Sequence, residues 1–292
     1  MNNPGRCLCG SVAWEITAEP FQAYNCHCKM CRKAHGAPFG TYWFLLPDQF
    51  RWTSDTDTIV HYRSSHLLTR SFCRTCGSVV PYPSERRGLV VAPAGCHDNG
   101  RKSDCEIFVA HKAPWFDITS DLPRHDDYPP ESGYERVEHE PMPEGPEGVV
   151  RGSCLCGAIE LHVTEPFRTV HNCHCSRCRR GRAAAHTSNG VTSMNGVKFI
   201  RGEEHLKSYK VPDAKFFTQV FCEICGSKMP RIDPDRQIAV TPLGILDDDP
   251  GMKPVDHIFV ADMAGWHDIT DDLPAFQQAP ASRSPGPPRH DR

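Results

Sequence analysis

Short runs of alternating or β-branched apolar residues recur along this chain, and most are bounded by glycine, proline or aspartate. Runs of this kind predict β-strands, because successive side chains of a strand point to opposite faces. The clearest runs cover residues 11–17, 41–46, 58–62 and 107–110. One short polar stretch, RKAHG after Cys31, predicts a single helical turn that ends in glycine. The pattern therefore predicts a mainly β fold.

The same pattern runs twice along the chain. RCLCGSVAWEITAEPF, starting at Arg6, returns as SCLCGAIELHVTEPF from Ser153, and YNCHCKMCRKAHG returns as HNCHCSRCRRGRA. Further on, SFCRTCGSVVP returns as VFCEICGSKMP, and EIFVAHKAPWFDITSDLP returns as HIFVADMAGWHDITDDLP. Because the matching segments keep their order and nearly their spacing, we infer a tandem duplication of one module followed by divergence.

Two stretches lack the periodicity of the modules. Residues 125–149 are dominated by proline, glutamate and glycine, a composition that favours an extended linker over a core. Residues 275–292 are rich in proline and polar residues, and we expect a disordered tail there. The predicted organisation is a first domain at 1–124 (copy one), the linker, a divergent second domain at 150–274 (copy two), and the tail.

The charge balance argues against two classes of partner. The 292 residues include 33 Lys and Arg against 36 Asp and Glu, so no strong overall field would gather nucleic acid or an anionic membrane. The chain lacks a run of apolar residues long enough to span a membrane, and its start, MNNPGRCLCG, lacks the basic and apolar regions of a secretory signal. We expect a cytoplasmic protein without nucleic-acid or membrane partners.

Sixteen cysteines are unusual in a chain of this length. In the cytoplasm thiols stay reduced, and reduced cysteines clustered as Cys-x-Cys and Cys-x-x-Cys are typical of metal sites. Cys96 and Cys105 stand alone and are expected to be small buried apolar residues. The other fourteen fall into the same ligand spacings in both copies, seven in each, and predict zinc.

The seven cysteines of each copy divide into a set of four and a set of three, although spacing alone does not show which are neighbours in space. Four thiolates complete the tetrahedron that zinc prefers, which is typical of a structural site, whereas three leave the exchangeable position that a catalytic zinc requires. We expect two zinc ions per copy and four per chain. The structural sets are Cys7, Cys9, Cys73 and Cys76 in copy one and Cys154, Cys156, Cys222 and Cys225 in copy two; the open sets are Cys26, Cys28 and Cys31, and Cys173, Cys175 and Cys178.

Four histidines lie close to the open sets. His27 and His174 stand between the first two cysteines, and because alternate residues of a local loop tend to point in opposite directions, we expect them to face away from the metal. His35 and His186 are expected to be surface or core residues and not ligands.

Four motifs follow one another in copy one: GRCLCG near the start, CHCKMCRK with GAPF close behind, FCRTCGS, and a strand leading to APW. This series resembles the glutathione-dependent formaldehyde-activating enzyme family, which includes centromere protein V, and the resemblance covers nearly all of both copies. It implies a β-tent fold of zinc-held antiparallel sheets, with a structural zinc on the four-cysteine set and a labile catalytic zinc on the three-cysteine set. It also implies the joining of glutathione and formaldehyde into S-hydroxymethylglutathione, a carbon–sulfur lyase chemistry.

Copy one matches the family more fully than copy two. Its GAPF segment at residues 36–39 and its KAPW run are replaced in copy two by RRGRAAAH and DMAGW. A rigid turn that contains proline would define a pocket wall beside the open metal, which small flexible residues would not. We therefore expect activity in copy one, with copy two mainly supporting it.

These residues support a coherent chemistry. A thiol bound at an open zinc position loses its proton more readily, and the resulting thiolate attacks an aldehyde carbon. Arg32 and Lys33, beside the open set, either pair with the carboxylates of glutathione or are solvated surface charges. The predicted function is a zinc-dependent carbon–sulfur lyase-type enzyme acting on glutathione–aldehyde adducts, with a small-molecule thiol and an aldehyde as partners. The alternative is a non-catalytic zinc module that binds glutathione or a protein partner.

Overall fold

The computed structural model describes residues 2–66, 68–84, 87–133 and 145–280, and in these ranges strands far outnumber helices. The mainly β prediction is confirmed. Copy one contains the strands β1 (Asn3–Arg6), β2 (Ala13–Ile16), β3 (Gln22–Cys26), β4 (Gly40–Leu45), β5 (Phe50–Trp52), β6 (Ile59–Arg63), β7 (Thr69–Cys73), β8 (Val79–Val80), β9 (Tyr82–Ser84), β10 (Leu89–Pro93), β11 (Cys105–Ile107) and β12 (Arg124–His125). Copy two contains β13 (Val150–Ser153), β14 (Glu160–Val163), β15 (Thr169–Cys173), β16 (Thr187–Ser193), β17 (Val197–Arg201), β18 (Leu206–Lys210), β19 (Thr218–Cys222), β20 (Lys228–Met229), β21 (Arg231–Asp233), β22 (Ile238–Pro242) and β23 (Asp256–Ile258).

Each copy builds two small sheets and one larger sheet. The small sheets have the orders β1-β2-β5 and β6-β7-β8 in copy one, and β13-β14-β17 and β18-β19-β20 in copy two. The larger sheets run β12-β11-β3-β4-β10-β9 and β21-β22-β16-β15-β23. Neighbouring strands of the small sheets are antiparallel, whereas β11 and β23 join the larger sheets in parallel beside β3 and β15. The central strand β4 is buried at every position, which explains why its sequence, GTYWFL, is largely apolar.

Each copy also carries one seven-residue α-helix, which begins directly after the second cysteine of the open set. Helix α1 (Lys29–His35) starts two residues before Cys31, so the prediction of a turn after Cys31 placed its start too late. The reason is local: the Cys28 side chain accepts a hydrogen bond from the backbone N–H of Cys31 and caps the helix. Gly36 ends α1 with a left-handed φ of 60°. Helix α2 (Ser176–Arg182) repeats this arrangement in copy two, with Cys175 as the cap and Ala183 (φ 55°) at the position of the glycine.

The strand predicted at residues 107–110 is also misplaced. The strand β11 ends at Ile107, Phe108 adopts a left-handed φ of 59°, and a 3₁₀ turn follows at Val109–His111. Because a left-handed residue reverses the pleat, the apolar run cannot continue as a strand. Copy two repeats the same break at Phe259 (φ 58°).

The hydrophobic cores do not follow the boundary between the copies. Trp266 of copy two lies in the core built around Trp14 and Trp43, and Trp115 of copy one lies in the core built mainly by copy two. The Trp266 indole N–H donates to the carbonyl of His97 at 3.1 Å. The two copies therefore exchange their C-terminal tryptophans. The predicted domain limits at residues 124 and 150 stay a prediction, but each predicted domain contributes to the core of the other.

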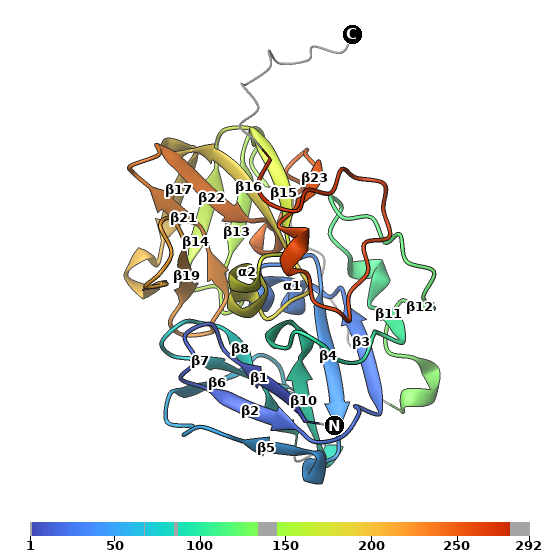
Figure 1. The fold of residues 1–292 in the computed structure, drawn as a ribbon. Helices are drawn as coiled ribbons and strands as arrows, with labels where there is room; N and C mark the ends of the chain where they lie inside the picture. The colour runs from blue at the N-terminus through green and yellow to red at the C-terminus, as the bar shows by residue number, and fades with distance from the viewer. Residues whose placement is uncertain (1, 67, 85–86, 134–144, 281–292) are drawn as a thin grey trace.

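The two helices lie at the junction of the copies (Figure 1). Helix α1 packs on the 3₁₀ turn Leu243–Ile245, and α2 packs on the equivalent turn Ala94–Cys96 of copy one. Glycine is needed in both turns: a Cβ at Gly95 would lie 2.1 Å from the backbone nitrogen of Ala184, and one at Gly244 would lie 2.4 Å from that of Ala37. The junction is thus a close backbone contact repeated by approximate two-fold symmetry.

Part of the predicted linker and the start of the predicted tail are ordered against the sheets. The linker's first residue, His125, ends β12, which pairs in parallel with β11, and the Tyr128 ring packs 4.9 Å from that of Phe108. In the tail, the backbone N–H of Phe276 donates to the carbonyl of His257 at 2.8 Å. The rest of the linker prediction at 134–144, and of the tail prediction at 281–292, falls outside the described residues.

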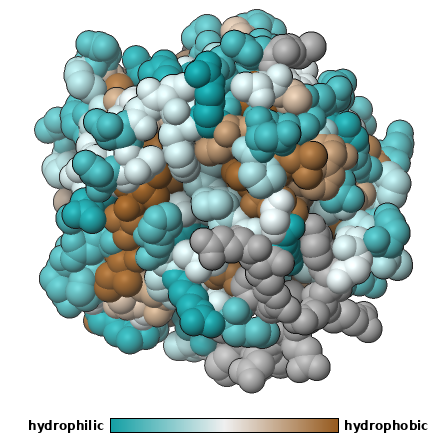
Figure 2. Space-filling view, turned by 90° about the horizontal axis from the view of Figure 1, so that it is seen from below, coloured by the Kyte–Doolittle hydropathy of each residue, from teal (hydrophilic) through white to brown (hydrophobic). Residues whose placement is uncertain are grey.

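The surface is mixed in polarity. Figure 2 shows brown apolar patches separated by hydrophilic residues on one face of the molecule. In the described part of the chain the exposed large apolar side chains include Phe21, Leu46, Ile200 and Phe216. Within the same residues, no helix has the length and apolar character needed to cross a bilayer.

Candidate metal centres

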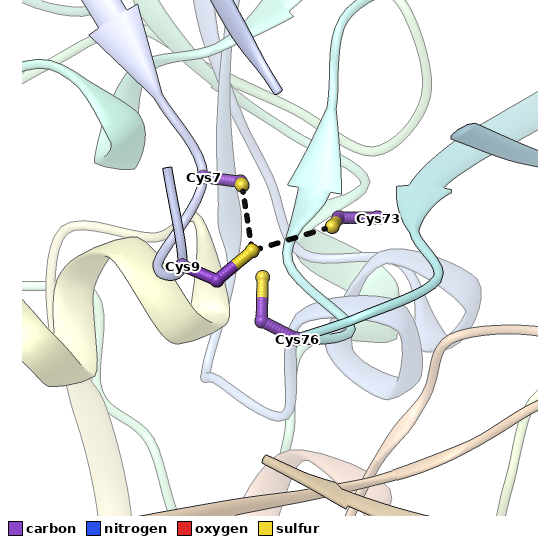
Figure 3. Close-up of side chains that lie close together, drawn as sticks. All are labelled: Cys7, Cys9, Cys73 and Cys76. Atoms are coloured by element: carbon purple, nitrogen blue, oxygen red, sulfur yellow. Dashed lines mark hydrogen bonds between the residues drawn. The ribbon is translucent and has the colours of Figure 1, made fainter. Parts of the chain in front are cut away.

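The four-cysteine set of copy one comes together at the junction of its two small sheets. Cys7 and Cys9 lie on the turn between β1 and β2. Cys73 ends β7 and Cys76 lies on the turn to β8, where Gly77 adopts a φ of 72°. Figure 3 shows the four side chains pointing toward a common centre. The Sγ atoms of Cys7 and Cys9 are 3.5 Å apart, and those of Cys9 and Cys73 are 3.7 Å apart. Zinc–sulfur bonds of tetrahedral geometry place sulfurs about 3.8 Å apart, so this set fits a zinc ion.

Copy two assembles its four-cysteine set in the same way. The sulfurs of Cys154 and Cys156 are 3.4 Å apart, and those of Cys156 and Cys222 are 3.8 Å apart. A backbone N–H points at one sulfur of each set: that of Val12 at Cys7 (3.4 Å) and that of Ile159 at Cys154 (3.2 Å). Such donors stabilise the thiolate form that a metal requires.

The three-cysteine sets are also brought together. Cys26 ends β3, Cys28 caps α1 and Cys31 lies within α1, so strand and helix together fix three sulfurs within 4.8 Å of one another. Cys173, Cys175 and Cys178 repeat this geometry at β15 and α2. All sixteen cysteines of the chain are free thiols. A soft, three-sulfur donor set without a disulfide fits zinc with one position left for another ligand.

Three buried side chains surround the copy-one set, and of these the sequence pattern pointed only to His35, as a surface or core residue. Arg70 on β7 donates through Nη2 to Cys31 Sγ (3.4 Å) and through Nη1 to the Tyr42 hydroxyl (2.9 Å). His35 Nδ1 faces the carbonyl oxygen of Arg182 at 2.7 Å and therefore carries the proton, so Nε2 of the neutral ring accepts from the Tyr42 hydroxyl, also at 2.7 Å. Burial lowers the pKa of His35 to about 4, which keeps the ring neutral.

These groups shape the electrostatics of the set. Contacts with Cys26 and Cys28, together with the nearby Arg70 cation, hold the pKa of the Cys31 thiol well below its ordinary value. Arg70 is only 3% exposed, so its charge acts on the thiolates with little screening by solvent. The copy-one set therefore combines three converging thiols with one buried cation, and Cys31 is the thiol whose ionisation that cation favours.

The copy-one set opens onto a small aromatic cavity of about 60 Å³. The lining combines the three cysteines and Arg70 with apolar and aromatic side chains, among them Tyr24, Met30, Tyr42, Phe44, Tyr82 and Phe108. The segment at 36–39 was expected to form a wall of the pocket beside the open metal, but it does not line this cavity. Phe39 instead lines a different cleft, because the turn after α1 leads the chain away from the thiols and toward copy two.

The structure gives Arg32 and Lys33 buried positions on the side of α1 that meets copy two. Lys33 Nζ lies 2.7 Å from Asp247 and also donates to Ser153, and its side chain is 5% exposed. Lys33 is thus neither a solvated surface charge nor free to pair with glutathione. Arg32 is 8% exposed, and burial lowers its pKa. Its contact with glutathione stays a prediction.

Copy two surrounds its three thiols with different residues. The positions of His35, Tyr42 and Arg70 are taken by Arg182, Asn189 and Gln219. Gln219 is 1% exposed, and neither its Nε2 nor its Oε1 has a hydrogen-bond partner. The hydroxyl and imidazole that face the thiols of copy one are therefore missing at these positions of copy two.

A fifth cluster contains histidine in place of cysteine. Ring nitrogens of His174, His186 and His267 lie within 4.8 Å of one another beside a cleft of about 320 Å³ between the copies. The expectation that His27 and His174 face away from the thiols agrees with their partners, since His27 Nε2 contacts Glu106 (2.7 Å) and His174 Nε2 contacts His257 (2.8 Å). The sequence does contain a signal for this histidine cluster: His186 and His267 stand where copy one has Phe39 and Phe116.

Comparison with known proteins gives the chain its family. The family model described as "Glutathione-dependent formaldehyde-activating enzyme" matches residues 2–111 and again residues 149–262. The chain belongs to this family. The two matches contain all fourteen clustered cysteines, and they confirm the resemblance seen in the motifs.

Individual relatives are distant. A protein of Halomonas elongata named "Putative glutathione-dependent formaldehyde-activating enzyme" is 24% identical over 127 residues, which are 41% of this chain and 81% of that protein. An uncharacterized lyase of Schizosaccharomyces pombe is 29% identical over 76 residues, 26% of this chain and 53% of its own length. A crystal structure of a Rhodobacter sphaeroides protein, 24% identical, covers 32% of this chain and 85% of its own, but its TM-score of 0.26 carries no argument about the fold.

Proposed function

We propose that this chain is a zinc-dependent carbon–sulfur lyase-type enzyme that forms or breaks the adduct of a thiol and an aldehyde, with glutathione and formaldehyde as the substrates indicated by its family. The site is the three-cysteine set of copy one. The observation that carries the proposal is the combination found there: three converging thiols, a buried arginine, and a tyrosine–histidine pair at the edge of a small cavity.

Cys26, Cys28 and Cys31 would hold the ion, whose role when bound is to lower the pKa of a thiol at the remaining position. Three thiolates give such a centre a net charge of about −1, which disfavours a fourth anion. Arg70 offsets this charge because its guanidinium donates to Cys31 Sγ. In copy two the equivalent position holds the neutral Gln219, and the nearby charge comes from the buried Arg182 instead, so the two centres differ in where their compensating cation lies.

The Tyr42 hydroxyl and His35 are placed to handle the proton. Addition of a thiol to formaldehyde forms one C–S bond, and the proton lost from sulfur ends on the new hydroxyl oxygen, so no other reactant is needed. The Tyr42 hydroxyl lies 3.6 Å from Cys31 Sγ and 2.7 Å from His35 Nε2. It can give a proton to the developing alkoxide and regain one in the reverse direction, because Arg70 also supports its oxygen.

The cavity restricts the part of the substrates that can enter. A volume of about 60 Å³ has room for an aldehyde carbon and the terminal thiol group, whereas the rest of a tripeptide must remain outside. The lining is mostly aromatic and apolar and offers water few hydrogen-bond partners, which favours attack by sulfur over hydration of the aldehyde.

The test compares two matched variants, Cys28→Ser and Cys175→Ser, each reloaded with zinc and assayed with glutathione and formaldehyde against the uncatalysed reaction. Serine is a good helix cap, so both variants should keep their helices. We expect Cys28→Ser to reduce the rate to the uncatalysed level and Cys175→Ser to retain most of it. Loss only in Cys175→Ser would place the site in copy two, and equal loss in both would indicate a shared site. No loss in either would favour a non-catalytic zinc module that binds glutathione or a protein partner.

A further inference from the structure

Three imidazoles of copy two converge at a point that the thiolate chemistry does not use. His174 follows β15, His186 directly precedes β16, and His267 comes from the segment after the exchanged Trp266, so three separate parts of the chain supply one nitrogen each. We infer that these histidines form a metal site for a divalent transition ion such as zinc, separate from both thiolate centres of copy two. Imidazole nitrogen is a preferred ligand for such ions.

Two of these rings have nitrogens that lack any other partner. His186 is 4% exposed, and neither its Nδ1 nor its Nε2 makes a hydrogen bond. His174 is fully buried, and its Nδ1 also lacks a partner. A buried polar atom left without a partner destabilises the folded protein. Coordination of an ion would satisfy one nitrogen of each ring.

Asp271 determines which nitrogen of His174 is available. Its carboxylate accepts a hydrogen bond from His257 Nε2 at 2.9 Å, so Nδ1 of the neutral His257 ring is an acceptor. That nitrogen lies 2.8 Å from His174 Nε2, which must therefore donate. The lone pair of His174 is left on Nδ1, the unpartnered atom. Metal-binding histidines commonly have their second nitrogen oriented in this way by a carboxylate-linked acceptor.

Copy one contains the same triangle of rings with different chemistry. His27, Phe39 and Phe116 occupy the equivalent positions, and their ring centroids are 5.3, 5.8 and 5.6 Å apart. The rings of His174, His186 and His267 are 5.1, 5.8 and 5.5 Å apart. Copy one shows that phenylalanine fits these positions of the fold. Histidine at both places in copy two adds polar atoms to an apolar contact, which is unfavourable unless they bind a ligand.

The site can be reached from outside the protein. His186 and His267 line the 320 Å³ cleft between the copies, and His267 is partly exposed. The carboxylates of Glu106 and Asp271 line the same cleft and favour a cation there. Three neutral imidazoles would leave the ion its full positive charge and a position open to the cleft. That position would take water or an anionic ligand, in contrast to the thiolate centres.

The test measures total metal per chain in the full-length protein. Protein with its thiolate centres loaded with zinc is incubated with Co²⁺, desalted and analysed by mass spectrometry. We expect one ion per chain more in the unmodified protein than in His186→Phe/His267→Phe, which places the residues of copy one at these positions. The additional cobalt should lack the near-ultraviolet charge-transfer absorption of cobalt–thiolate centres. A His162→Phe control, outside the cluster, should keep the additional ion.

Equal metal content in the unmodified protein and the double variant would overturn the inference, and so would thiolate charge transfer from the additional cobalt. Should the double variant fail to fold, His267→Phe alone replaces it, because this side chain is partly exposed. We expect that variant to weaken Co²⁺ binding at least tenfold, and unchanged binding would equally contradict the site. Neither measurement depends on turnover of glutathione and formaldehyde. Both therefore test the histidine site even if the proposed enzyme activity is absent.

Discussion

Arg70 is the residue that most clearly separates the two open centres. Its guanidinium joins Cys31 Sγ to the Tyr42 hydroxyl, whereas Gln219 at the same position of β19 has no hydrogen-bond partner for either amide atom. The three cysteines are the same in both copies, so they cannot explain a difference in chemistry. The difference must come from the groups that set the charge and the proton supply around them.

Replacing Arg70 by Gln, the residue of copy two, should therefore weaken the copy-one centre without unfolding it. Hydrogen bonds to charged groups contribute about 1.5–3 kcal/mol. Loss of that energy from the transition state would lower kcat/KM by about tenfold to hundredfold. Steady-state kinetics with glutathione and formaldehyde measures this loss. The thiols should also titrate at higher pH in the metal-free variant, because Cys31 loses the nearby cation. Arg70→Lys keeps the charge and should recover part of the rate; an Arg70→Gln variant with full activity would contradict this role.

His97 offers a test of pH dependence at a single buried residue. Trp14 Nε1 donates to His97 Nε2 at 2.9 Å, and burial lowers the pKa of His97 to about 3. In the unfolded chain the pKa is about 6.5. Between these values the unfolded state binds a proton that the folded state does not, so His97 destabilises the fold as the pH drops from 6.5 toward 3.

His97→Gln should make the protein less sensitive to acid, because glutamine can still accept from Trp14 but does not titrate. The free energy of unfolding, measured with urea at pH 7 and pH 5.5, should fall by about 1 kcal/mol less in the variant than in the unmodified protein. The comparison between variants cancels the acid sensitivity of the zinc thiolates. An identical decrease in both proteins would show that His97 is protonated in the folded state.

At the residue scale, sequence spacing could predict the sets of sulfurs that the structure brings together but not their surroundings. Cys-x-Cys and Cys-x-x-Cys pairs are local, so the backbone turn itself brings their sulfurs close. Arg70 is 39 residues from Cys31 in the sequence, so only the tertiary fold brings its side chain to the thiol. The histidine cluster can be recognised in the sequence only by aligning the two copies, because His186 and His267 then stand opposite Phe39 and Phe116.

At the element scale, the four-cysteine set of copy one joins two sheets that are barely large enough to be stable alone. Cys7 and Cys9 belong to the sheet β1-β2-β5, and Cys73 and Cys76 to the sheet β6-β7-β8. Three short strands are about the minimum for a sheet that is stable on its own in water. A metal that connects them contributes directly to the free energy of folding.

Cys73→Ser should consequently destabilise the protein far more than Cys28→Ser. The first change removes a ligand from the set that joins the sheets, with an expected cost of several kcal/mol. The second removes a ligand from the open set while serine keeps the cap of α1. Thermal unfolding followed by circular dichroism distinguishes the two. Equal decreases in the melting temperature would mean that the open set is as structural as the closed one.

The elements themselves were predictable where the pattern is periodic and misplaced where a side chain sets the boundary. Alternation located β2, β4 and β6 to within two residues. The start of α1 was missed because a thiol is not a usual helix cap, and Cys28 takes that role only through its hydrogen bond from Cys31. The strand at 107–110 was misplaced because the left-handed φ of Phe108 leaves no trace in hydrophobicity.

For the whole molecule, the sequence predicted the duplication but not the exchange of tryptophans and other contacts between the copies. A repeat with a proline-rich connection predicts two independent domains, yet Arg179 of α2 donates to the carbonyl of His97 at 2.9 Å, and Lys33 of α1 pairs with Asp247. Lys228 extends the same pattern, since its ammonium group donates to the carbonyls of Gly77 and Gly226 and so connects both cysteine turns. Contacts between copies depend on the relative placement of two folded units, about which local periodicity carries no information.

This exchange predicts that the two copies unfold together. Trp115 is 1% exposed within a core formed mainly by copy two, and Trp266 is 3% exposed within the core of copy one. Truncation of a buried tryptophan costs about 3–5 kcal/mol. In Trp115→Ala the loss falls on the core of copy two, and because copy two in turn supplies Trp266 to copy one, the destabilisation should reach both. Urea unfolding should show one transition, shifted as a whole in either Trp115→Ala or Trp266→Ala.

A matched control is Trp52→Ala, which removes a partly buried tryptophan that packs on Trp14 within copy one. Its effect should be smaller because less apolar surface is lost. The decisive measurement follows zinc release from each four-cysteine set during unfolding, using cobalt at one set as a spectroscopic label. In Trp115→Ala both sets should release metal at the same lowered urea concentration. If only Cys154, Cys156, Cys222 and Cys225 released metal early, the copies would be independent domains, and the exchanged tryptophans would be contacts without cooperative effect.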